Sequence, residues 1–210
     1  MNLATKISTI VIAIYAGLLG MIHGVFEILQ GNNKATGLLI NAIGIDFESQ
    51  FIWLEGLPAF SILLNFLASG IIAIIVSLAV FLYALIYINN NSCKIILVIL
   101  SILMFLFGAG FIPPFLCLIA AIISQKINKP INFKFNSDYI NLILIAKLWI
   151  WVLCFYILWI IGEWILGYFY PNIILKHSFL FFLIKLVLPF LLFFTGLAYD
   201  YRKSKSSTTN

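Results

Sequence analysis

A histidine and a glutamate stand one helical turn apart inside an apolar run, in the stretch "GLLGMIHGVFEILQG" at residues 17–31. An imidazole and a carboxylate are groups that bind ions and transfer protons. Small residues continue the stripe of His23 and Glu27 at helical spacing: Ala13, Ala16, Gly17, Gly20 and Gly24. Small residues at this spacing let a second helix approach closely. We therefore expect His23 and Glu27 to face protein and not lipid.

Other polar side chains occur at a similar depth in the apolar runs. His23 and Asn65 each lie about seven residues, or about 10 Å, below the outer end of their predicted span, so we expect them to pair. The same arithmetic places Glu163 opposite Lys185 in the last two spans. An unpaired ionisable group at this depth is costly. The sequence thus predicts a polar layer in the outer half of the membrane, made of His23, Glu27, Asn65, Glu163 and Lys185, with His177 near its mouth.

Two interpretations of this layer stay open. It binds an ion, a proton or a small solute, or each pair satisfies itself and only fixes the register of the helices. The spacing of His23 and Glu27 resembles one half of a di-metal helix motif, but a second ligand pair is missing from the neighbouring spans. His177 lies several residues shallower than His23, which argues against haem. We therefore assign no catalytic residue, no metal and no cofactor.

The composition of the chain points to a bilayer. The 210 residues are 64% hydrophobic and 9% charged, with a formal net charge of +5, whereas soluble proteins carry about 25% charged residues. The positive charge lies in short connections and not on one basic face, so we expect no nucleic-acid partner. The sequence also has no P-loop and no G-x-G-x-x-G motif, and nucleotide chemistry by those motifs is excluded.

Apolar runs of about 20 residues are long enough to cross a bilayer. Four of them predict spans over residues 5–29, 58–88, 139–168 and 178–200. A further apolar run, residues 95–124, holds helix breakers in its middle: Gly108, Gly110, Pro113 and Pro114. A break inside lipid must be covered by protein or line a wet cavity. We expect two short helices, 95–110 and 114–125, in a hairpin whose tip reaches the polar layer.

The predicted fold class is an all-α integral membrane helical bundle, with four full spans and a helical hairpin broken by glycine and proline. Five plain spans are the alternative. Positive residues favour the hairpin, because with a cytoplasmic N-terminus only Lys34 and Lys176 then fall in outer connections. We expect one transmembrane domain over residues 1–200 and a basic polar tail over 201–210. The chain is then a multi-pass protein of the cell membrane with both termini in the cytoplasm.

The first connection, residues 30–57, is long for a compact bundle and is expected outside the cytoplasm. It contains Asp46, Glu48 and Glu55, with turn signals between apolar patches. Three interpretations are open for it: a lid over the polar layer, a docking surface for a partner subunit, and an interfacial segment held by residues 51–54.

Four short blocks of the sequence carry a resemblance to a known group. The blocks "HGVFEILQG", "GLLINAIG", "GAGFIPP" and "GLAYD" resemble those of an uncharacterised family of small prokaryotic polytopic membrane proteins. That family usually has a third glycine where this chain has Ala109. The resemblance implies a small prokaryotic membrane protein and transfers no catalytic residue.

Two functions from different classes follow from these patterns. In the first, the chain is a small permease or channel that binds an ion, a proton or a small solute in the polar layer and lets it permeate, as discontinuous helices do in transporters. In the second, it is a non-catalytic accessory or assembly subunit that binds another membrane protein. Besides the lipid bilayer, the expected partners are a second copy of the chain or another membrane protein. A lipid-modifying enzyme with His23 and Glu27 as acid and base is a third interpretation.

Overall fold

Four helices in the described part of the chain are long and apolar enough to cross a membrane. The structure is a computed structural model and describes residues 1–41, 49–55, 57–90, 92–131 and 139–206. The four long helices are α1 (Leu3–Leu29), α2 (Phe66–Ile86), α5 (Tyr139–Phe169) and α7 (Ser178–Ser206). The shorter helices are α3 (Cys93–Leu106), α4 (Ile112–Ser124) and α6 (Pro171–Lys176). A 3-10 helix, η1 (Ser49–Leu54), and a strand pair, β1 (Leu39–Asn41) with β2 (Pro58–Phe60), complete the fold.

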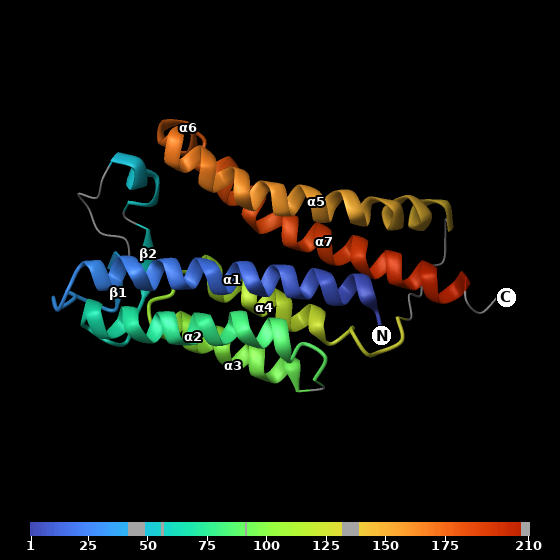
Figure 1. The fold of residues 1–210 in the computed structure, drawn as a ribbon, viewed down its shortest axis with the longest axis horizontal. Coiled ribbons are helices and arrows are strands. Elements are labelled where there is room, and N and C mark those ends of the chain that lie inside the picture. Colours follow the sequence, from blue (N-terminus) through green and yellow to red (C-terminus); the bar gives the residue numbers. More distant parts are fainter. Residues whose placement is uncertain (42–48, 56, 91, 132–138, 207–210) are drawn as a thin grey trace.

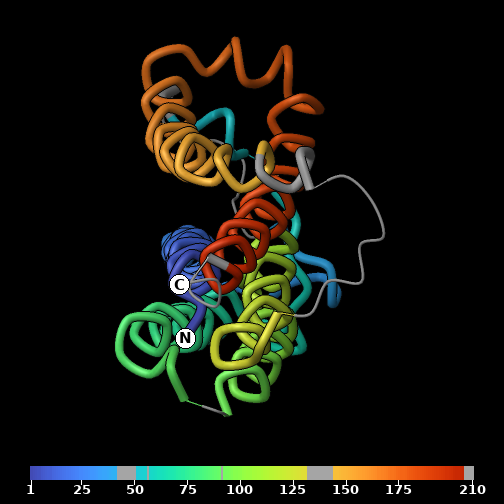
Figure 2. Tube along the Cα trace, turned by 90° about the vertical axis from the view of Figure 1, so that its right-hand side faces the viewer, coloured from blue at the N-terminus to red at the C-terminus, as the bar shows by residue number. Residues whose placement is uncertain are grey.

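The helix α1 is the centre of the bundle. It packs against α2, α4 and α7, and Figure 1 shows α2 and α3 along one side of it and the α5–α7 pair along the other. Both termini lie at one end of the bundle, and β1, β2 and α6 lie at the other, which we call the α6 end. Seen along the bundle, α1 and α4 separate the α5–α7 pair from α2 and α3 (Figure 2). The predicted all-α membrane bundle is confirmed.

Small residues bring α1 and α2 into close contact. A side chain added at Gly24 would come within 2.7 Å of the carbonyl oxygen of Gly70, and one added at Gly17 within 2.9 Å of that of Ser77. Only glycine leaves room for the facing backbone at such positions. This is the contact that the stripe on the first span predicts, and His23 and Glu27 on the same helix are both buried.

The helices α3 and α4 form the expected hairpin. Lys94 near the start of α3 bonds Gln125 just after α4 (Nζ to Oε1, 3.3 Å), and the Asn128 side chain donates to the carbonyl of Asn89 at 3.1 Å. Closer to the turn, Ser101 Oγ of α3 donates to the carbonyl of Pro114 in the first turn of α4 at 2.7 Å. The chain therefore enters and leaves at the same end of the bundle, and the alternative of five plain spans is wrong.

The helix bounds differ from the predicted ones at the turn of the hairpin. Gly108 and Gly110 have φ of +85° and +82°, a backbone conformation that glycine adopts without strain. The helix α3 thus ends at Leu106, before the predicted 110. The helix α4 begins at Ile112, before the predicted 114, because proline is tolerated in the first turn of a helix.

The second span also needs correction. Residues 58–60 are strand β2, paired with β1, and α2 begins only at Phe66, because Asn65 caps it: Oδ1 accepts from the Ala68 N–H at 3.0 Å. The predicted span of 58–88 is therefore too long at its start. The predicted polar tail is helical as far as Ser206. Asp46 and Glu48 of the first connection lie outside the described residues.

A buried aspartate joins the first and the last helix. Asp200 of α7 accepts hydrogen bonds from the backbone N–H groups of Ala4 and Thr5 at 3.1 and 2.8 Å, and from the Thr5 hydroxyl at 2.8 Å. It satisfies N–H groups in the first turn of α1 that have no partner inside the helix.

Cysteine labelling tests the hairpin in a membrane. In a background without the native cysteines, Asn90→Cys and Asn128→Cys are expected to react with an impermeant maleimide from the same side of the membrane. Lys176→Cys, at the α6 end, is expected to react only from the opposite side. Reaction of positions 90 and 128 from opposite sides would contradict the hairpin.

Candidate functional site

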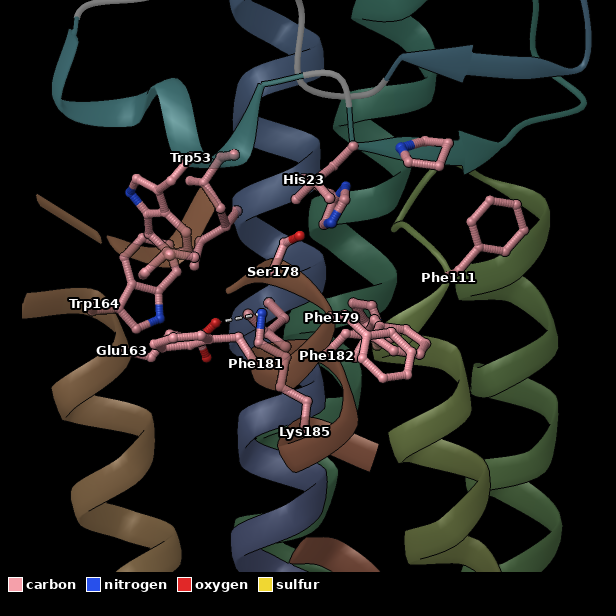
Figure 3. Close-up of a pocket in the computed structure, with 18 residues that line it drawn as sticks. His23, Trp53, Phe111, Glu163, Trp164, Ser178, Phe179, Phe181, Phe182 and Lys185 are labelled. Atoms are coloured by element: carbon pink, nitrogen blue, oxygen red, sulfur yellow. Dashed lines mark ion pairs between the residues drawn. The ribbon is translucent and has the colours of Figure 1, made fainter. Parts of the chain in front are cut away.

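A cavity of about 530 Å³ lies at the α6 end between α1, α5, α7 and the start of α4. Its wall is mainly apolar and aromatic, and Figure 3 shows Trp53 and Trp164 on one side and Phe111 on the other. The polar residues of the wall are His23, Glu163, Ser178 and Lys185. The remaining lining residues are Leu19, Ile22, Trp53, Leu54, Leu57, Pro58, Phe111, Ile112, Pro113, Trp164, Ile174, Phe179, Phe181 and Phe182. Such a cavity can hold a largely apolar molecule with a polar group.

An ion pair stands in the wall of this cavity. Lys185 Nζ on α7 lies 2.6 Å from Glu163 Oε1 on α5, as the depth arithmetic predicts. The Glu163 side chain is 1% exposed and that of Lys185 is 19% exposed. Glu163 Oε2 also accepts a hydrogen bond from the Tyr15 hydroxyl at 3.3 Å. Glu163 is thus engaged on both oxygens, while the ammonium group of Lys185, with three donors, has the more open position.

His23 contributes to the same cavity from α1. Its imidazole packs on the hairpin turn, since a side chain added at Gly110 would come within 2.6 Å of Nε2. Nδ1 is buried and has no hydrogen-bond partner among the described residues. The expected burial of His23 is confirmed, whereas the expected pairing with Asn65 is wrong. Asn65 is the cap of α2, and its side chain donates to Asn32 Oδ1 at 2.7 Å.

Glu27 is separate from the cavity. It is fully buried and lies against the other glycine of the turn, since a side chain added at Gly108 would meet both of its carboxylate oxygens and, at 2.6 Å, the Ser69 hydroxyl. Neither oxygen of Glu27 has a hydrogen-bond partner among the described residues. The tip of the hairpin therefore reaches His23 and Glu27 as predicted, but the single polar layer becomes two sites. Pro113 of the tip lines the cavity, and the neighbouring Pro114 is buried in the first turn of α4.

Two further residues at the α6 end lie in or next to the cavity wall. His177 ends α6 with its side chain exposed, outside the cavity, and it is the next residue, Ser178, that lines it. Trp53 of the first connection lines the cavity, so this segment contributes to its wall. It is buried against Gly167 and against the ring of Trp164, with centroids 5.2 Å apart. A tryptophan in a long loop gives no sequence signal for this particular contact.

No group of three or more histidine, cysteine, aspartate or glutamate residues that could hold a metal ion occurs among the described residues. The chemistry that the cavity offers is therefore charge and hydrogen bonding from Lys185, His23 and Ser178 inside an apolar wall. Such a wall strengthens each polar contact.

Removal of one partner of the ion pair should cost more than removal of both. Glu163→Gln and Lys185→Met each leave one charged group buried without its partner. The double variant should be more stable than either single variant, with a coupling free energy of about 1–3 kcal/mol. Unfolding of the purified variants in detergent measures it. Additive losses would show that the two charges do not interact.

Gly110→Ala is expected to destabilise the fold by about 1–3 kcal/mol, because alanine is strained at this positive φ and its methyl group would collide with His23. Gly162→Ala on α5 is the matched control, since no atom of the described residues outside its own helix turn lies within 4 Å of the added methyl group. It should leave the unfolding temperature unchanged or raise it slightly. Equal effects of the two substitutions would contradict the tight contact at the turn.

Comparisons of the chain with protein families, with curated proteins and with solved structures find no match. The resemblance of its motif blocks to a group of prokaryotic membrane proteins stays a prediction.

Proposed function

We propose that this membrane protein binds a small amphipathic molecule, with an apolar body and an anionic group, in the cavity at the α6 end. The observation that carries the proposal is the open position of Lys185 in an otherwise apolar and aromatic wall. Both oxygens of Glu163 are already engaged, by Lys185 and Tyr15. The ammonium group of Lys185 therefore has more hydrogen-bond donors than Glu163 has free acceptors. A carboxylate or phosphate group supplies the missing acceptor.

The shape of the helix pair α4 and α7 supports access from the bilayer. The two helices touch at Phe115 and Phe190, whose ring centroids are 6.3 Å apart. Closer to the α6 end, Phe111 and Phe179 line the cavity and are 40% and 75% exposed. Figure 3 shows Phe111, from the start of α4, above Phe179 and Phe182 of α7, on the side of the cavity away from Trp53 and Trp164. Exposed aromatic rims of this kind suit a molecule that arrives from the lipid phase.

The packing below the cavity favours binding over free permeation. Ile12, Tyr156 and Leu192, from α1, α5 and α7, are fully buried there. Passage toward the other end of the bundle therefore requires the helices to separate. Permeation stays a prediction, which flux through vesicles containing the protein would test. The accessory-subunit alternative likewise stays a prediction, with co-purification of a stoichiometric membrane partner as its test.

A fluorescent carboxylate tests the binding proposal directly. Protein in nanodiscs is titrated with 11-(dansylamino)undecanoic acid, and energy transfer from tryptophan is measured, since Trp53 and Trp164 line the cavity. We expect saturable transfer that unlabelled undecanoate displaces. The Glu163→Gln, Lys185→Met double variant keeps the cavity neutral but lacks the cation, and its affinity should be at least about tenfold lower.

The control is Lys176→Met, which removes a lysine near the α6 end that does not line the cavity. It should bind the probe like the unmodified protein. Saturable binding of the methyl ester of the probe with equal affinity, or unchanged binding by the double variant, would contradict an anionic ligand at Lys185.

A further inference from the structure

A second buried polar site lies on the far side of the hairpin turn and is made only of oxygen atoms. The Ser61 and Ser69 hydroxyl oxygens are 2.7 Å apart, and Ser69 Oγ is 3.3 Å from the carbonyl oxygen of Phe107. The carboxylate of Glu27 lies beside Ser69 against Gly108. The side chains of Glu27, Ser61 and Ser69 are fully buried.

Glu27 is the member of this site that the protein leaves unsatisfied. Both of its oxygens are buried and neither has a hydrogen-bond partner among the described residues. A carboxyl group buried in an apolar bundle needs a proton, a donor or a cation. The two serine hydroxyl groups beside it are bonded to each other and to backbone carbonyls. Each hydroxyl group has one hydrogen but two lone pairs, so the serine oxygens can also act as acceptors in the cluster.

The cluster is assembled from several segments that lie beside the hairpin turn. Glu27 comes from α1 and Ser69 from the first turn of α2, while Ser61 follows β2 and forms a bridge with Phe107. Phe107 caps the C-terminal end of α3, where unsatisfied carbonyl groups favour a positive charge. Discontinuous helices in membrane proteins bind cations with such ends.

We propose that Glu27, Ser61, Ser69 and the carbonyl of Phe107 bind a monovalent metal cation, with Na⁺ as the preferred ion. Oxygen ligands select hard cations. One carboxylate among neutral ligands balances one positive charge, whereas divalent ions in proteins recruit further carboxylates or many more oxygens. The site is independent of the proposed ligand cavity, because Glu27 does not line it. A bound cation fastens the hairpin turn to α1 and α2.

Thermal unfolding in detergent tests the proposal. Sodium chloride replaces N-methylglucamine chloride at constant ionic strength. Unfolding is followed by the reaction of a thiol dye with Cys93 and Cys117, which are buried in the folded protein. The background variant Cys154→Ser removes the exposed thiol. We expect a saturable rise of the unfolding temperature, by about 5 °C at a hundredfold excess over Kd. Potassium should act more weakly at equal concentration.

The variants separate a cation site from a general salt effect. Glu27→Gln should abolish the response to Na⁺, and Ser69→Ala, which keeps the carboxylate, should raise the half-saturating concentration at least tenfold. The second variant decides the question if the first does not fold. Glu163→Gln, at a buried carboxylate outside this cluster, should respond to Na⁺ like the unmodified protein.

Three outcomes would overturn the site: an unfolding temperature that does not depend on Na⁺, a response retained in both Glu27→Gln and Ser69→Ala, or stabilisation by acidification alone, which would show that Glu27 carries a proton. None of them bears on carboxylate binding at Lys185, so the two proposals fail separately.

Discussion

The turn between α3 and α4 is the constraint on which the rest of the fold depends, because it ends two helices inside the bundle, where lipid offers backbone groups no partners. The chain meets this requirement with its own backbone. Gly108 N–H donates to the carbonyl of Phe60 at 3.0 Å, and Ile62 N–H donates to that of Leu106 at 2.9 Å. Residues that would otherwise begin a long span are used to cover the turn, and α2 therefore starts late, at Phe66.

The same turn explains why α1 is rich in small residues and yet carries two ionisable ones. Close packing of α1 on α2 through Gly24 and Gly70 leaves space at the tip of the hairpin only for glycine backbone. His23 and Glu27 lie against the two positive-φ glycines, one on the cavity side and one on the side of Ser69. One helix thereby places an imidazole and a carboxylate in two separate environments, although they are only one turn apart along the sequence.

The features that the sequence predicts well are those with a strong periodic or compositional signal. Runs of apolar residues locate the long helices, the glycines and prolines locate the hairpin, and counting along two helices is enough to pair Glu163 with Lys185. The pairing of His23 with Asn65 is wrong because counting assumes a continuous helix, and the strand contact of Ile40 with Ala59 replaces its first turns. The place of Trp53 in the cavity wall and the capping of α1 by Asp200 depend on contacts between segments far apart along the chain, and no local pattern encodes them.

The capping of α1 by Asp200 has a consequence for biosynthesis. The aspartate and Thr5 are separated by 195 positions, so α1 receives its cap only when α7 has been made. Until then the first turn of α1 keeps N–H groups without a protein acceptor, at the same end where Asn2 donates to the carbonyls of Lys126 and Lys129. Once the hairpin has been made, Asn2 can donate its hydrogen bonds to the segment that follows α4. The hydrogen bonds between α7 and the start of α1 can form only after Asp200 has left the ribosome. The capping of α1 is thus coupled to the synthesis of α7.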